Sequence, residues 1–214
     1  KNQFEKELRE QQLKRLSKQC KWSYHKINNL EAGKKLNEQF NQIKDNDVNF
    51  VVYNFVDMLS HARTEMEMIR ELASDEAAYR SLTKSWFEHS PLQELIQKFR
   101  EIGAHLIITT DHGTVKVNKP IKIVGERSTN TNLRYKVGRG LSYDSKEVFV
   151  VNKPTEAFLP QIKLSNEYVF ARESDFFVYP NNYNHFVNHY GNTFQHGGIS
   201  MEEMLIPFIE LQPK

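Results

Sequence analysis

The chain has 214 residues, of which 39% are hydrophobic and 12% aromatic, enough to bury the core of one large or two small domains. Its formal net charge of +2 is near neutral, so net charge gives no reason to expect a nucleic-acid partner. A single cysteine, Cys20, excludes an intramolecular disulfide and a cysteine-based zinc site, and it fits a reducing, cytoplasmic compartment. No apolar run approaches the roughly 18 residues that span a bilayer, so we expect no membrane partner.

The first half of the chain is expected to alternate helices and strands. It opens with the charged run KNQFEKELRE, which has no signal-peptide pattern and no Met, so we expect it to continue a longer protein. Residues 1–17 are helix-prone, residues 22–27 alternate like a strand, and residues 30–43 have helical spacing. Residues 48–56 (VNFVVYNFV) are almost continuously apolar, which predicts a central strand covered on both faces.

After that strand we expect two helices, at about 62–73 and 81–102, the second ended by Gly103. Residues 104–110 (AHLIITT) then predict a second buried strand. A strand, a helical crossover and another apolar strand make a parallel α/β unit. The fold class is therefore α/β, with a largely parallel sheet flanked by helices.

The second half changes character at about residue 115. Short alternating segments (VKV, IKIV, EVFVV, EYVFA and FFVY) run to about residue 180, separated by Gly, Pro, Asn and Ser. They predict a β-rich antiparallel insertion at about 115–180 within one domain. A loop, a short helical turn and a strand over 206–211 end the chain.

Polar residues follow both predicted core strands. Asp57 comes at the end of the first strand, and His61 would share its face of a helix that began there. A carboxylate and an imidazole that converge suit zinc or manganese. The pattern D-x-x-x-H alone is weak, and a helix-capping Asp beside an unrelated His explains it as well.

Two further segments add metal-binding side chains. Asp111, His112 and Gly113 follow the second strand, where the glycine permits a sharp turn, although a polar turn has the same composition. His196 precedes two glycines, which let its loop approach another group closely. Ser200 and Glu203 then form a capping box that begins a short helix, which Pro207 ends.

The order D-x-x-x-H, then T-D-H-G, then a late H-G-G resembles the alkaline phosphatase superfamily. The ending HGGISMEEMLIPFIEL is similar to the close of PglZ domains, so residues 1–214 resemble the C-terminal portion of a PglZ domain. The segments SYHKI and VVYNFVDMLSHAR resemble the effector domains of response regulators associated with type IX secretion. The resemblance implies a metal-dependent phosphoester hydrolase, a phosphodiesterase or phosphatase acting on oligonucleotides or cyclic nucleotides.

The resemblance also implies a two-metal site, most simply with two Zn²⁺ ions. It assigns Asp57, His61 and His196 to the first ion, and Asp111 and His112 to the second. The family's Thr or Ser nucleophile and another second-metal Asp have no match in residues 1–56, where Ser23 lies within an alternating strand. We therefore expect both residues upstream of Lys1, and no phosphoester turnover by this chain alone.

The resemblance implies several partners besides a phosphodiester or nucleotide substrate: an N-terminal receiver domain, a second copy in a homodimer, and a transcription factor. An alternative function is a non-catalytic metal-binding domain that regulates transcription or secretion through protein partners. The five intact ligands favour the enzyme, because a decayed enzyme usually loses one of them.

A basic stretch lies between the motifs. Its members are Lys116, Lys119, Lys122, Arg127, Arg134, Lys136 and Arg139. An exposed patch of this kind would draw an anionic substrate toward the metals. Edge strands protected by lysine explain the same composition. His185 and His189, spaced i,i+4, match no ligand of the family and are interpreted as partly buried packing residues or as residues near the mouth of a cleft.

Overall fold

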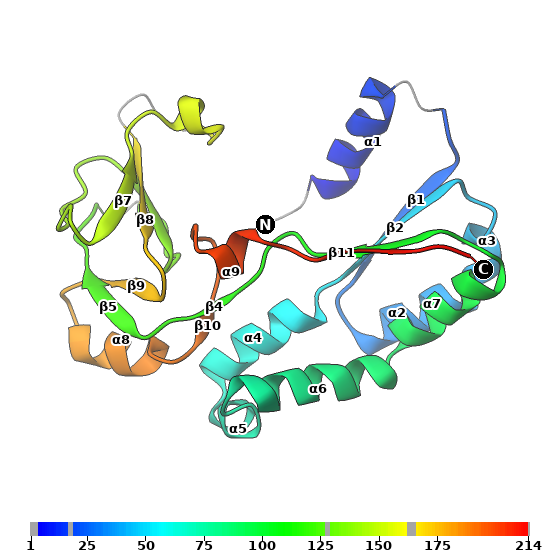
Figure 1. Cartoon of the computed structure of the whole chain (residues 1–214), viewed down its shortest axis with the longest axis horizontal. Helices are drawn as coiled ribbons and strands as arrows, with labels where there is room; N and C mark the ends of the chain where they lie inside the picture. The colour runs from blue at the N-terminus through cyan, green and yellow to red at the C-terminus, as the bar shows by residue number, and fades with distance from the viewer. Residues whose placement is uncertain (1–3, 17–18, 127–128, 162–165, 214) are drawn as a thin grey trace. The chain divides into compact units, whose positions relative to one another are not determined.

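The structure, a computed structural model, describes residues 4–16, 19–126, 129–161 and 166–213 (Figure 1). Internal contacts divide the chain into two compact units. The first comprises Lys1–Leu59, Glu71–Leu106 and Glu210–Lys214, and the second comprises Ser60–Arg70 and Ile107–Ile209. Among the described residues, no helix combines the length and hydropathy that a bilayer crossing requires.

The first unit contains a parallel strand pair. β1 (Trp22–Ile27) pairs with β2 (Val48–Tyr53) in the register Trp22↔Val48 to Ile27↔Tyr53. Helices α2 (Leu30–Glu38) and α3 (Phe40–Ile43) make the crossover between them, and α1 (Glu5–Arg15) precedes β1. The α/β class is confirmed, since strand, crossover helices and parallel strand follow one another as that class requires.

Packing of the crossover on a later helix makes the core of this unit. The buried cluster consists of Ile27, Leu36, Ile43, Leu95 and Phe99. Helix α7 (Pro91–Glu101) supplies the last two, and its Pro91 carbonyl accepts a 2.9 Å hydrogen bond from Asn37 Nδ2 on α2.

Several helix boundaries differ from those that the sequence predicts. The helix expected at 30–43 is broken at Gln39, which ends α2 and precedes α3. The helix expected at 81–102 is two helices, α6 (Glu76–Glu88) and α7. Pro91 takes the first position of α7, where its missing N–H costs nothing, and Ser90 caps the new helix. Gly103 follows α7 with φ +71°, as predicted.

The prediction of one strand covered on both faces and of a second buried strand is wrong. β2 is only half-buried, and in β3 (Leu106–Thr109) Ile107 is 55% exposed. The physical reason is sheet size. In the described part of the chain β2 pairs with β1 and β3 pairs with β11 (Phe208–Leu211), each in a two-stranded sheet. No further described strand covers these edges.

The second unit holds the β-rich part of the chain. β6 (Tyr135–Gly138), β8 (Glu167–Ala171) and β7 (Val148–Val151) form the predicted antiparallel sheet, with β8 in the centre (Figure 1). β5 (Lys119–Lys122) and β9 (Asp175–Val178) are instead parallel. Their shared core cluster consists of Ile121, Ile123, Leu141, Val148, Val169, Ala171 and Phe177.

The remaining short elements of this unit lead to the functional loops. β4 (Val115–Lys116) pairs antiparallel with β10 (Phe194–Gln195). His196 is the residue directly after β10. Helix α8 (Tyr183–Tyr190) precedes β10, and α9 (Met201–Met204) comes between β10 and β11. A 3₁₀ turn, η1 (Pro154–Ala157), follows β7, and α5 (Glu67–Leu72) precedes α6.

Candidate metal centre

Asp57 and His61 lie on one helix. β2 ends at Tyr53 and α4 (Phe55–Glu65) begins two residues later, so Asp57 lies in the first helical turn and not at a strand end as the sequence suggested. The start of α4 is held by α6, because Phe55 stacks on Trp86 with ring centroids 3.9 Å apart. Since residues four apart share a helix face, Asp57 and His61 point to the same side of α4.

The second half of α4 is tied to the strand that leads into His196. Arg63 is buried and donates a 2.9 Å hydrogen bond from Nη1 to the carbonyl of Asn192. Its guanidinium also lies 5.1 Å from the ring centre of Phe194 in β10. These contacts place the His61 ring 5.9 Å from that of His196, at an interplanar angle of 82°.

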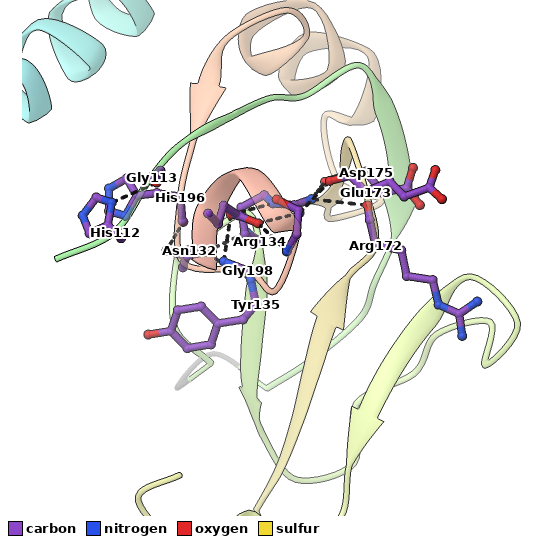
Figure 2. Close-up of polar contacts among 12 residues, drawn as sticks. His112, Gly113, Asn132, Arg134, Tyr135, Arg172, Glu173, Asp175, His196 and Gly198 are labelled. Atoms are coloured by element: carbon purple, nitrogen blue, oxygen red, sulfur yellow. Dashed lines mark hydrogen bonds and ion pairs between the residues drawn. The ribbon is translucent and has the colours of Figure 1, made fainter. Parts of the chain in front are cut away.

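His112 and His196 lie face to face. Their ring centroids are 4.0 Å apart and their planes differ by 9° (Figure 2). The Nδ1 atom of His112 lies 3.0 Å from the carbonyl oxygen of Gly113. Because a carbonyl only accepts hydrogen bonds, Nδ1 carries the proton, and the lone pair of Nε2 is left to bind a metal.

Three predicted ligands lie close together within the second unit. The ring of His196 is 4.0 Å from that of His112 and 5.9 Å from that of His61. Imidazole nitrogens bind zinc at about 2.0–2.1 Å, and three imidazoles are the donor set of some open catalytic zinc sites. These residues therefore fit a zinc-like ion, whereas Asp57 belongs to the first unit and stays a predicted ligand.

His61 and Asp111 are the more exposed predicted ligands of the second unit. His61 is exposed, at the ring distance given above. Asp111 has a side chain 75% exposed, with Oδ1 3.8 Å from His112 Nε2. The structure thus brings four of the predicted ligands together in the second unit, and the division of the five ligands between two ions stays a prediction.

Sequence reasoning missed the residues that hold the histidine loops. Asn132 Nδ2 donates to the carbonyl of His196 at 3.2 Å, and a Cβ at Gly197, where φ is +102°, would come within 2.8 Å of that amide. The Glu203 carboxylate accepts from the Gly198 N–H at 2.8 Å. The capping box that the sequence predicts at Ser200 and Glu203 is present, and it was the one signal that pointed to this carboxylate.

Arg134 completes the buried network around Glu203. Its Nε and Nη2 atoms donate to the two carboxylate oxygens at 3.0 and 2.8 Å, with side chains 0% and 1% exposed. The dashed lines in Figure 2 also join Arg134 to the carbonyls of Glu173 and Asp175. Burial by itself would raise the pKa of Glu203, but hydrogen bonds and charge from Arg134 hold this pKa below its ordinary value.

The interpretation of the basic stretch as one exposed patch is wrong for two of its members. Arg134 and Lys136 are fully buried, where they bind carbonyl and carboxylate oxygens of the protein. Arg139 pairs with Glu126 at 3.1 Å, and Lys119 pairs with Glu147 at 3.4 Å. Arg127 lies outside the described residues. Sequence position alone did not separate internal from surface cations.

Ser23 is not an activated nucleophile in this structure. Its hydroxyl donates to Asn49 Oδ1 at 2.6 Å, and His25 Nε2 lies 2.7 Å from Ser23 Oγ. Because the Ser23 proton lies in the hydrogen bond to Asn49, the imidazole is the donor to Ser23 Oγ and does not act as a base. Thr110, next to Asp111, likewise donates its hydroxyl to the His112 carbonyl at 3.0 Å.

Comparison with known proteins supplies the family. The model of the family described as "BREX system PglZ alkaline phosphatase-like domain" matches residues 3–211, nearly the whole chain. Among curated proteins, none matches.

Proposed function

The chain belongs to the PglZ family of alkaline phosphatase-like domains, and we propose from this premise that it carries the metal site of a phosphoester hydrolase. The observation that supports the proposal most strongly is the stacked pair of His112 and His196, at positions that carry the family resemblance. The family and the chemistry of these side chains both favour phosphoester hydrolysis at divalent ions.

The chain's own residues would prepare this chemistry in two ways. The Gly113 carbonyl keeps the His112 proton on Nδ1, so that Nε2 can donate its lone pair. The Asp57 carboxylate, as a ligand, would lower the net charge of a divalent ion. Bound there, the ions would polarise a phosphoryl oxygen and lower the pKa of the attacking hydroxyl or water.

The finer parts of the proposal rest on sequence resemblance. We propose two Zn²⁺ ions, with Asp111 and His112 serving the less complete site. The hydroxyl nucleophile and a further Asp would come from a preceding segment, since the Ser23 and Thr110 hydroxyls donate elsewhere. The domain would be the output of a cytoplasmic response regulator of type IX secretion, joined to a receiver domain, with a phosphodiester or nucleotide as substrate.

The test is a turnover assay on the full-length protein and on this chain side by side. The substrates are bis-p-nitrophenyl phosphate and p-nitrophenyl phosphate, with added zinc. We expect zinc-dependent hydrolysis by the full-length protein, loss of at least about 100-fold in its His196→Ala variant, and none by this chain alone. His185→Ala, which changes a helix α8 histidine outside the cluster, is the matched control. Full activity of His196→Ala would contradict the proposal.

One observation favours a second candidate, a metal-binding domain that acts through protein partners. Between α9 and β11 the second unit exposes consecutive apolar side chains, with Leu205 and Phe208 each 67% exposed. Exposed apolar patches of this kind often contact another protein. If the full-length protein hydrolyses neither ester with zinc bound, this candidate becomes the better one.

A further inference from the structure

We infer that the buried pair Arg134–Glu203 is a positioning element that sets the distance between the two stacked histidines, an inference that rests on the proposed function. Neither residue contacts the donor atoms, and neither belongs to the ligand set. Their place in the hydrogen-bond network joins the loop of His112 to the loop of His196.

Glu203 contacts both loops at once. Its backbone carbonyl accepts from the N–H of Gly113, the residue after His112, at 2.9 Å. Its Oε1 atom accepts from the N–H of Gly198, two residues after His196, at 2.8 Å. One residue therefore fixes both chain segments that present the imidazoles, through one main-chain and one side-chain acceptor.

Both contacts require glycine. A Cβ at Gly113 would lie 1.9 Å from the Glu202 carbonyl oxygen, and a Cβ at Gly198 would lie 2.6 Å from Glu203 Oε2. Real Cβ atoms do not come so close, so the loops reach helix α9 only because these positions have no side chain. Gly198 and Gly113 are thus required for the same reason, which is the close approach of each loop to helix α9.

Arg134 gives the carboxylate a single orientation. The guanidinium donates from two nitrogens to the two carboxylate oxygens, and the Ser200 N–H donates to Oε2 at 3.1 Å. On its other side the guanidinium donates to the Glu173 carbonyl at 2.7 Å, in the turn before β9, and to the carbonyl of Asp175, the first residue of β9. Because a two-point contact between planar groups defines direction as well as distance, Oε1 is left facing Gly198.

A role in stability alone explains this pair poorly. Buried ion pairs often contribute little net stability relative to apolar side chains of the same volume, whereas they do specify geometry. Lys136, two residues from Arg134, is equally buried but donates to the Asn130 carbonyl and contacts neither histidine loop. It provides the comparison that separates loss of a buried cation from loss of positioning.

The experiment uses four forms of the chain: wild type, Arg134→Lys, Glu203→Gln and the control Lys136→Met. Arg134→Lys keeps the charge but loses the two-point contact, so its fold should survive. Amide hydrogen exchange at Gly113 and Gly198 is measured without metal, and zinc affinity by competition with a chelator. We expect faster exchange at Gly198 and about 10- to 100-fold weaker zinc binding in Arg134→Lys and Glu203→Gln, and neither change in Lys136→Met.

The outcomes separate the inference from the function on which it rests. Absence of zinc binding by the wild type would refute the proposed metal site. If Arg134→Lys and Glu203→Gln both bind zinc as tightly as the wild type and show its exchange rate at Gly198, only the positioning role is refuted. If Lys136→Met weakens zinc binding as much as the other two variants do, the positioning role is also refuted, because a general loss of stability would then be the cause.

Discussion

The rings of His112 and His196 stack 4.0 Å apart, although one follows β3 and the other follows β10, far along the chain. Two imidazoles at this distance suit one ion or, as the family resemblance implies, two neighbouring ions. A ligand that binds the folded state alone stabilises that state by mass action.

Zinc should therefore stabilise the chain against unfolding. With free zinc at 100 times its dissociation constant, the gain is about 2.7 kcal/mol. His112→Ala and His196→Ala should each lose most of this gain, whereas His189→Ala on α8 should keep it. Thermal unfolding with and without zinc measures the effect. Equal zinc-induced stabilisation of His112→Ala and wild type would count against the cluster.

Removing one partner of the buried ion pair should be costly. Arg134→Met leaves the Glu203 carboxylate buried without its counter-charge, which typically costs about 3–5 kcal/mol. The double variant Arg134→Met/Glu203→Met should be more stable than Arg134→Met, since no unpaired charge remains. Urea unfolding midpoints of the two variants provide the comparison. A double variant less stable than the single one would show that the two residues do not act as a pair.

Glu203 should also make the fold sensitive to acid. Its pKa in the folded protein is below the ordinary value of 4.5, so its contribution to stability is present above that value. This contribution is lost as pH falls through the lower, folded pKa. We expect the stability difference between wild type and Glu203→Gln to shrink as pH falls below 4.5. A difference that stays constant from pH 6 to acid would contradict the assigned pKa direction.

Lys136 should make stability depend on pH in alkali as well. Burial lowers its pKa from 10.5 to about 8, so the unfolded chain binds more protons between these values. Stability of the wild type should then rise with pH in this interval, relative to Lys136→Met, which has no such group. The free energy of unfolding of both proteins is measured at several pH values between 7 and 10. Tyrosine titration contributes to both curves, so it cancels in their difference. Parallel curves would show that the ammonium is solvated.

The sequence predicts well those features that depend on local patterns. The alternation at Trp22–Ile27 gives β1 at the predicted residues, and the Ser200–Glu203 capping box begins α9 as expected. The α/β class follows from the order of such elements. Local hydrogen bonding and side-chain periodicity are sufficient for these predictions.

Features that depend on tertiary partners could not be predicted as well from the sequence. An apolar run such as LIIT predicts burial, but exposure of Ile107 is decided by which strands pair beside β3. A basic run predicts a surface patch, but Arg134 is internal because Glu203, distant in sequence, provides its counter-charge. The sequence named five candidate ligands, whereas the stacking of His112 on His196 depends on long-range contacts made through Glu203.

The most direct measurement of the central claim is X-ray absorption at the zinc edge, on the chain loaded with one equivalent of zinc. The account predicts imidazole scattering in a shell of nitrogen and oxygen ligands at about 2.0–2.1 Å. That imidazole signal should weaken in His112→Ala and in His196→Ala, and remain unchanged in His185→Ala. A zinc spectrum without imidazole, or one that neither His112→Ala nor His196→Ala alters, would contradict the account.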